Sequence, residues 1–190
     1  MKWVGDKLTL PIDGNRVELL FRPGATGSPV TVQIDGKKPS AFPELYLPTR
    51  VYHPEPAHPT PLLLKTGAKS PRVLEEWTLT ASDFSADRMK FKYAVAGGAT
   101  GPDGEGVSDR PFVSKSGRLT IDPGDFHIGL LAKVVELHKT DRLVMKWNVV
   151  PLFADEAAPP PSRGREFESA VTVAQGLRPG PHVLELTAGP

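Results

Sequence analysis

Two histidines and a carboxylate lie within six residues in the segment His53-Pro54-Glu55-Pro56-Ala57-His58. Imidazole and carboxylate groups are common ligands of transition metals, so this segment is a candidate metal site and a candidate catalytic centre. Its prolines, however, stiffen the backbone toward an extended form, which opposes the convergence of the ligands. We therefore interpret the segment as a solvated loop. A metal enzyme built on His53 and His58 is the least favoured of the functions considered.

A second group of candidate ligands occurs in the segment 103–109, where Asp103, Glu105 and Asp109 alternate with glycine and small residues. Ca²⁺ takes about six to eight oxygen ligands, often from loops in which glycines let backbone carbonyls turn inward. The spacing does not match an EF-hand. The sequence therefore predicts either a structural calcium site at Asp103, Glu105 and Asp109 or a plain polar turn.

The motifs of hydrolytic enzymes are missing from the sequence. No Gly-x-Ser-x-Gly segment occurs, and Gly124-Asp125 is followed by Phe126 instead of the serine of a Gly-Asp-Ser esterase. The segment 114–117 has the composition of a hairpin turn. No pair of carboxylates is singled out as the acid and nucleophile of a glycosidase, and cysteine is absent. We therefore predict no catalytic residue.

Aromatic side chains are the groups on which sugar-binding proteins stack pyranose rings, because they combine a flat apolar face with a polar edge. Trp147 shares its period-two phase with three apolar residues of the same predicted strand, which places it in the core. The predicted ligand-binding residues are Trp77, Tyr46, Tyr52 and Trp3. For Tyr46 and Tyr52 the alternative is that each ring anchors a long proline-rich loop.

The elements that position these residues are strands. Alternating apolar and polar residues predict short strands, and Asp13-Gly14 predicts a hairpin that joins the first two. Residues 128–137 are predicted as a strand because they are rich in valine and isoleucine, with a helix as the alternative. Residues 39–61, 97–106 and 154–166 are rich in proline or glycine and are predicted as loops. The predicted strands are residues 7–10, 16–21, 29–35, 72–80, 89–95, 112–114, 118–122, 142–150, 171–174 and 182–187.

This pattern predicts an all-β fold, a two-sheet antiparallel β-sandwich that is jelly-roll-like and carries long Pro/Gly-rich loops. The 21 prolines and 18 glycines of the 190-residue chain fit a turn-rich β protein. We predict a single domain over residues 1–190. Its first two and last two strands pair across the chain ends, and residues 60–150 are inserted between them.

Charge and hydropathy exclude some classes of partner. The net charge is +1, and Lys and Arg are interleaved with Asp and Glu, so no basic stripe is available for nucleic acid. No apolar stretch is long enough to span a membrane, and residues 1–20 carry no signal peptide. The abrupt ends of the chain lead us to expect a domain excised from a longer exported protein, located in the periplasm or outside the cell.

Five segments carry a resemblance to a known family: residues 100–106, 112–118, 121–123, 147–153 and 175–186. Together they resemble the non-catalytic β-sandwich (jelly-roll) accessory region of SGNH/GDSL-type carbohydrate esterases from polysaccharide-degrading bacteria, over residues 97–187. The resemblance implies a parent protein that acts on acylated glycans and whose Ser-Asp-His machinery lies in a separate α/β domain. It carries no catalytic residue over to this chain.

We therefore expect a non-catalytic carbohydrate-binding module of a polysaccharide-active bacterial esterase. Its expected partners are a polysaccharide or oligosaccharide and the catalytic domain of the parent protein, and it needs no cofactor besides the calcium ion considered above. The alternative is a structural accessory domain that packs on the catalytic domain and has no ligand of its own. An exposed apolar patch larger than is ordinary for a monomer would favour this alternative.

Overall fold

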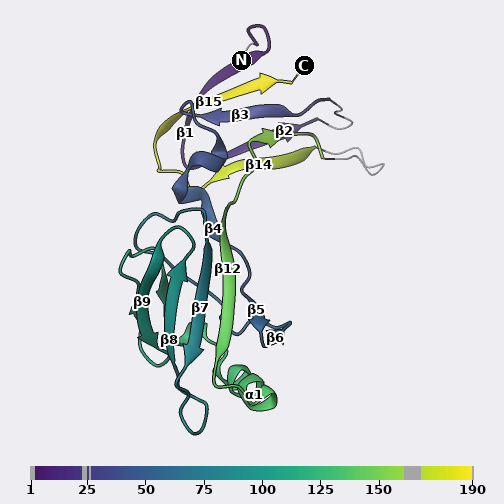
Figure 1. Cartoon of the computed structure of the whole chain (residues 1–190). Coiled ribbons are helices and arrows are strands. Elements are labelled where there is room, and N and C mark those ends of the chain that lie inside the picture. Colours follow the sequence, from purple (N-terminus) through teal and green to yellow (C-terminus); the bar gives the residue numbers. More distant parts are fainter. Residues whose placement is uncertain (1–2, 23–24, 26, 161–167, 190) are drawn as a thin grey trace. The chain divides into compact units, whose positions relative to one another are not determined.

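The computed structural model describes residues 3–22, 25, 27–160 and 168–189 (Figure 1). In this part of the chain the protein is built from antiparallel β-sheets and one α-helix, which confirms the predicted all-β, sandwich-like fold. The chain forms two compact units, where the sequence led us to predict a single domain. Unit 1 comprises Met1–Tyr46 and Pro151–Pro190, and unit 2 comprises Leu47–Val150. The segment inserted between the terminal strands is therefore a unit of its own and begins before residue 60.

The two ends of the chain pair with each other in unit 1, as predicted (Figure 1). The first sheet has the order β1 (Lys7–Asp13), β15 (Pro181–Ala188), β3 (Val30–Ile34) and β13 (Glu156–Ala157), and the second pairs β2 (Arg16–Phe21) with β14 (Ser169–Gln175). The predicted β1–β2 hairpin is wrong. Its turn carries the chain from one sheet to the other, because the apolar sides of both strands are buried only when the two sheets face each other.

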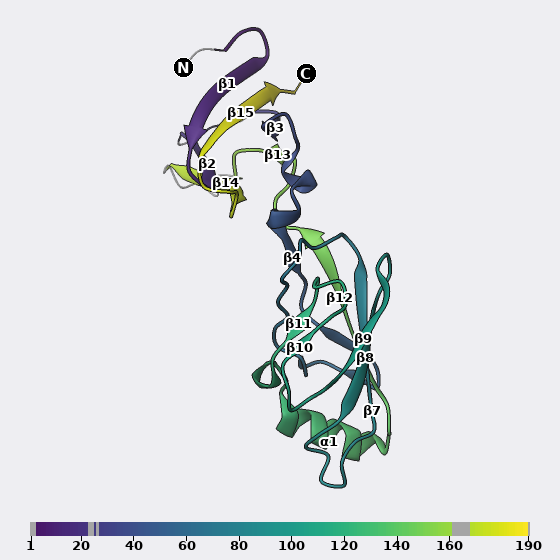
Figure 2. The same cartoon turned by 90° about the vertical axis from the view of Figure 1, so that its left-hand side faces the viewer.

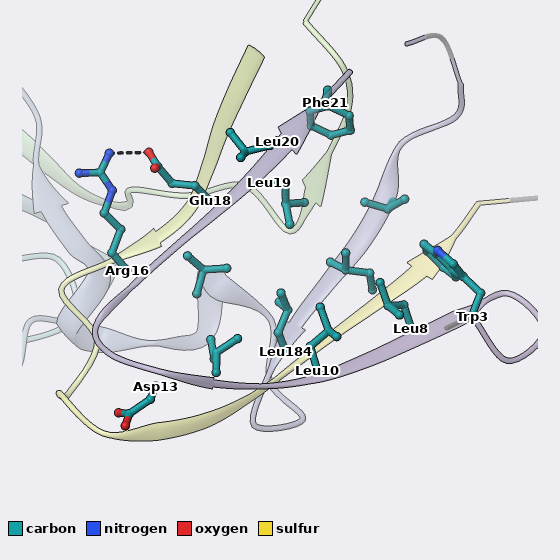
Figure 3. A pocket seen from close by; sticks show the side chains of 14 residues that line it. Trp3, Leu8, Leu10, Asp13, Arg16, Glu18, Leu19, Leu20, Phe21 and Leu184 are labelled. Carbon is teal, nitrogen blue, oxygen red and sulfur yellow. Dashed lines mark hydrogen bonds and ion pairs between the residues drawn. The ribbon is translucent and has the colours of Figure 1, made fainter. Parts of the chain in front are cut away.

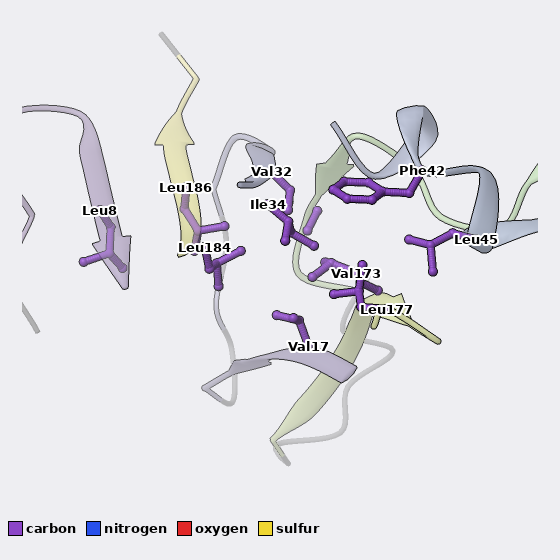
Figure 4. Packing of buried hydrophobic residues seen from close by; sticks show 12 residues of the cluster. Leu8, Val17, Val32, Ile34, Phe42, Leu45, Val173, Leu177, Leu184 and Leu186 are labelled. Atoms are coloured by element: carbon purple, nitrogen blue, oxygen red, sulfur yellow. The ribbon is translucent and has the colours of Figure 1, made fainter. Parts of the chain in front are cut away.

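The core of unit 1 lies between these two sheets (Figure 4). Val32, Ile34 and Leu184 from the first sheet meet Val17 and Val173 from the second. The proline-rich segment that follows β3 closes one end of this core. It forms two short 3-10 helices, η1 (Pro39–Ala41) and η2 (Pro43–Leu45), and the residues that follow contribute three short strands to unit 2. The prediction of a long ordered loop over residues 39–61 is therefore wrong in these parts.

Unit 2 is organised around one antiparallel sheet with the strand order β6-β5-β12-β7-β8-β9, and β4 also pairs with β12. Figure 2 shows β10, β11 and α1 on one side of this sheet. The elements are β4 (Tyr46–Pro48), β5 (Tyr52–Glu55), β6 (Ala57–His58), β7 (Glu76–Ser82), β8 (Lys92–Gly97), β9 (Gly101–Val107), β10 (Phe112–Val113), β11 (Thr120–Ile121), η3 (Pro123–Asp125), α1 (Ile128–His138) and β12 (Leu143–Pro151).

The register of β7 and β12 gives this sheet one buried and one open face. Trp147 lies opposite Trp77 and points inward, whereas the next pair along the strands, Lys146 and Thr78, points outward. The Trp77 side chain is only 2% exposed, and its ring stacks on that of Trp147 with centroids 6.4 Å apart. Trp77 is therefore a core residue and has no face free for a ligand, because strand periodicity turns it inward.

Two further predictions for unit 2 are wrong. Residues 128–138 form α1, not a strand, and Leu131, Val134 and Val135 at helical spacing are buried. The valine and isoleucine residues of this segment favoured a strand in the sequence, but burial of one helix face outweighs that preference. Residues 97–106, predicted as a loop, belong to the β8–β9 hairpin. There Gly106 is required, since a Cβ at this position would lie 2.6 Å from the Tyr93 ring.

Replacing Trp77 by alanine should lower the free energy of unfolding of unit 2 by about 3–5 kcal/mol, because it leaves a cavity beside Trp147. Trp3→Ala is the control, since Trp3 is 42% exposed and its loss should cost under about 1 kcal/mol. Urea denaturation followed by circular dichroism measures both changes. Equal midpoints for the two variants would contradict a core role for Trp77.

Candidate functional site

The two histidines of the candidate metal site lie on a two-stranded ribbon, where His53 of β5 is the register partner of His58 of β6. His53 is 4% exposed, and its Nε2 accepts a hydrogen bond of 2.9 Å from the backbone N–H of Leu62. Burial and the neighbouring His58 lower the pKa of His53 to about 4, so the ring is neutral near pH 7. With Nε2 accepting, the single proton of the neutral ring sits on Nδ1, and neither nitrogen is left for a metal.

The third candidate ligand of this segment, the carboxylate of Glu55, already has a partner. Glu55 forms an ion pair of 3.2 Å with Arg142. Among the described residues, no group of three or more His, Asp and Glu side chains is arranged to hold a metal ion. The hypothesis of a metal enzyme at His53 and His58 therefore gains no support from this geometry.

The buried His53 predicts a pH-dependent stability. The unfolded ring takes up a proton near pH 6.5 and the folded ring only near pH 4, so the unfolding free energy is highest above pH 6.5 and falls as the pH drops from 6.5 to 4. The loss should be about 3 kcal/mol. Urea denaturation at several pH values measures it. His53→Gln keeps an acceptor for the Leu62 N–H without a titrating ring, and the same pH dependence in this variant would contradict the assignment to His53.

The three carboxylates predicted to hold calcium do not converge on one point. Asp103 is buried and accepts hydrogen bonds from Ser116, 2.9 Å to its N–H and 2.6 Å to its hydroxyl. Asp109 pairs with Lys90 at 3.0 Å, and Glu105 is exposed to solvent on β9. The hydrogen bonds from Ser116 help to hold the pKa of Asp103 below its usual range despite its burial. This carboxylate ties β9 to the turn before Arg118, which is a structural role that needs no ion.

The same turn contains Ser114 and Ser116. β10 and β11 pair on either side of it, which confirms the predicted hairpin over residues 112–122. The Ser114 hydroxyl accepts the N–H of Leu119 at 3.2 Å. Ser114 and Ser116 are therefore engaged in closing the turn.

A buried carboxylate that the sequence did not single out is Glu75, which precedes β7. It accepts hydrogen bonds from the N–H groups of Ala99 and Thr100 and from the Thr100 hydroxyl, at 2.7–3.0 Å. Gly97 is required beside it, since a Cβ there would lie 2.2 Å from the Glu75 carboxylate. The glycine-rich composition of residues 97–101 was the only signal in the sequence of such a close approach.

The four predicted ligand-binding aromatic residues divide into two buried and two exposed side chains. Tyr46 is buried, and its hydroxyl donates to the Ser40 carbonyl at 3.1 Å, so it anchors the proline-rich segment as the alternative interpretation proposed. Trp77 lies in the core of unit 2. Tyr52 in unit 2 and Trp3 in unit 1 are 43% and 42% exposed, and only these two can present a ring to a ligand.

Tyr52 lies on the open face of the unit 2 sheet. Its register partner on β12 is Lys146, which in turn lies opposite Thr78 of β7, and Thr78 lies opposite Ala96 of β8. The Tyr52 hydroxyl donates to Glu76 at 2.7 Å, and the Lys146 ammonium binds the other carboxylate oxygen at 2.7 Å. We call this set, Tyr52, Glu76, Thr78, Ala96 and Lys146, the Tyr52 face.

The charges of the Tyr52 face are fixed at neutral pH. The hydrogen bond from Lys146 holds the pKa of Glu76 below its usual range, and the bond to Glu76 raises the pKa of Tyr52. Glu76 is therefore a carboxylate and Tyr52 a neutral phenol. The hydrogen bond to Glu76, which Lys146 holds in turn, favours one orientation of the Tyr52 ring on the open face of the sheet.

Trp3 lies at one end of a groove of about 670 Å³ in unit 1 (Figure 3). The walls are leucine, isoleucine, valine and phenylalanine side chains of β1 and β2, with Leu184 and Leu186 of β15. Asp13, Arg16 and Glu18 lie at the other end, where Arg16 pairs with Glu18. An apolar concave surface with few polar groups is typical of a binding site for an apolar partner.

The strand edge beside this groove is protected against the addition of a further strand. The backbone N–H of Ala188 in β15 donates a hydrogen bond to the carbonyl of Asp6, which directly precedes β1. Because the direction of the backbone hydrogen bonds alternates along an antiparallel strand, the even-numbered residues of β1 direct their N–H and C=O groups toward β15. The missing N–H of Pro11 therefore faces the open edge of β1, where it costs no hydrogen bond within the sheet and denies one to an incoming strand.

In comparisons with family models, with characterised proteins and with solved structures, no match to this chain was found. Within the described ranges, no helix has the length and apolar character needed to cross a lipid bilayer. The functional assignment therefore depends on the surfaces described above.

Proposed function

We propose that this protein is a non-catalytic carbohydrate-binding module that holds a glycan on the Tyr52 face of unit 2. The observation that carries the proposal is the exposed Tyr52 ring, held by the hydrogen bond of its hydroxyl to Glu76. A ring that is already fixed loses little conformational entropy when a ligand stacks on it.

The neighbouring side chains suit a sugar as ligand. Thr78 and Ala96, which follow Lys146 across the sheet, are short and partly exposed, so the open face beyond Lys146 has room for a flat pyranose. The carboxylate of Glu76 and the ammonium of Lys146 supply an acceptor and a donor for sugar hydroxyls. An apolar ring face next to paired polar groups matches the amphipathic surface of a pyranose.

The assignment of a binding function without catalysis is supported by how the titratable groups are used. Glu75 and Asp103 are buried among backbone and hydroxyl donors of neighbouring hairpin turns, and the neutral His53 accepts a backbone N–H. The resemblance to accessory regions of SGNH/GDSL-type esterases supports an exported, polysaccharide-active parent protein as the setting.

Tyr52→Ala should weaken glycan binding about tenfold, because it removes the stacking surface. Affinity gels with xylan, galactomannan, β-glucan, pectin and alginate identify the bound polymer, and titration calorimetry with its oligosaccharides gives the affinity. Trp3→Ala is the matched control, with almost the same exposed fraction in the other unit. It should leave the affinity unchanged, and both variants should unfold close to the wild-type midpoint.

Two outcomes would overturn the proposal. One is the absence of retention on every polymer. The other is a glycan affinity that Tyr52→Ala leaves unchanged while Trp3→Ala lowers it, which would move the site to unit 1.

The groove of unit 1 favours a second candidate function, a structural accessory domain that packs on the catalytic domain of its parent esterase. In that case the apolar walls are a protein interface. Leu20 lines the groove and is 70% exposed, so it can be changed with little effect on folding.

Leu20→Glu should weaken a complex between this chain and the purified catalytic domain at least tenfold, because it buries a charge in the interface. Val183→Glu is the control, since Val183 is an exposed residue of unit 1 that does not line the groove. Sedimentation velocity of the two components measures the complex. Equal effects of the two substitutions, or no complex with the wild-type chain, would argue against this function.

A further inference from the structure

A cavity of about 300 Å³ in unit 2 adjoins the segment that leads into β5. Residues 48–51 form one wall, and residues 61 and 63–66 form the other. Pro48, Pro61 and Leu63 give it an apolar lining, and the hydroxyl-bearing residues Thr49 and Thr66 add polar groups.

The charged side chains that line this cavity are both cationic. They are Arg50 and Lys65, and neither has a carboxylate within 4.0 Å in the described part of the chain. Arg50 lines the cavity and donates one hydrogen bond, of 3.2 Å, to the carbonyl of Pro59, which restricts its guanidinium. Two cations without a carboxylate partner give the mouth of the cavity a positive potential, which makes it complementary to an anion.

The cavity and the Tyr52 face are connected through the backbone of β12. The Thr49 hydroxyl accepts the N–H of Asn148 at 3.0 Å, and Asn148 lies opposite Glu76, to which Tyr52 donates. Along the chain, Val51 is buried while Arg50 and Tyr52 are exposed on either side of it. In an extended segment such residues lie about 7 Å apart on the same side, which is close to the size of one sugar ring.

We propose that the cavity binds the carboxylate of an acidic sugar, so that the glycan held on the Tyr52 face is a polyuronate. This inference rests on the proposed function and specifies its ligand class. The guanidinium of Arg50 matches the two oxygens of a carboxylate, and Lys65 adds a second positive charge. A uronate whose ring stacks on Tyr52 therefore meets a cation within one sugar residue of the stacking site.

The test compares polygalacturonate oligomers with the same oligomers as methyl esters, which keep the sugar and remove the negative charge. In titration calorimetry at low salt, the wild-type protein should bind the acid form at least tenfold more tightly than the ester. Arg50→Ala and Lys65→Ala should each lower affinity for the acid about fivefold and leave affinity for the ester unchanged. Lys69→Ala is the control, because Lys69 is exposed in the same unit and does not line the cavity.

The outcomes separate this inference from the proposed function. Binding of the ester and the acid with equal affinity, lost in Tyr52→Ala, would leave the Tyr52 face standing and overturn the polyuronate. Binding of the acid that is lost in Arg50→Ala and Lys65→Ala but kept in Tyr52→Ala would support the cation site and overturn the stacking site. Equally tight binding of a sulfated galactan would overturn the preference for a carboxylate. Arg50 and Lys65 are exposed, so circular dichroism should show all variants folded.

Discussion

The register between β7 and β12 is the constraint on which unit 2 depends. It places Trp77 on Trp147 inside the sheet, and by the alternation of strand side chains it places Lys146 beside Thr78 outside. A slip of β12 by one residue would turn Trp147 outward and Lys146 into the core, which strongly disfavours any other register. The hydrogen bonds that Glu76 accepts from Tyr52 and Lys146 exist on the outer face because the inner face is fixed by burial.

Most side chains that suggested chemistry serve the fold instead. Glu75 and Asp103 are buried carboxylates surrounded by N–H and hydroxyl donors of tight hairpins, and His53 accepts the N–H of Leu62. Each satisfies backbone groups that would be costly to bury without a partner. Three surface features remain available for recognition. They are the Tyr52 ring with the neighbouring charges of Glu76 and Lys146, the cations Arg50 and Lys65, and the apolar groove of unit 1.

Unit 1 illustrates a different balance between local and distant interactions. The turn at Asp13-Gly14 has the composition of a β-hairpin, yet β1 pairs with β15 and β2 with β14. Pairing with strands from the other end of the chain lets each strand bury its apolar side in the common core, and a hairpin alone provides no such core. Apolar side chains from both sheets, several of which also belong to this core, line the groove shown in Figure 3.

The sequence by itself determined the all-β class, the pairing of the chain ends, the core position of Trp147 and the turn at residues 114–117, because these follow from period-two alternation and turn composition. It also proposed Tyr52, Trp3, Tyr46 and Trp77 as ligand-binding rings without distinguishing the exposed pair from the buried pair. Only the tertiary structure decided that Trp77 and Tyr46 are buried, that residues 128–138 are helical, and that the chain forms two units. The physical reason is that burial and hydrogen-bond partners depend on contacts between residues far apart in the chain, such as Tyr52 with Glu76 and Thr49 with Asn148, which local patterns do not encode.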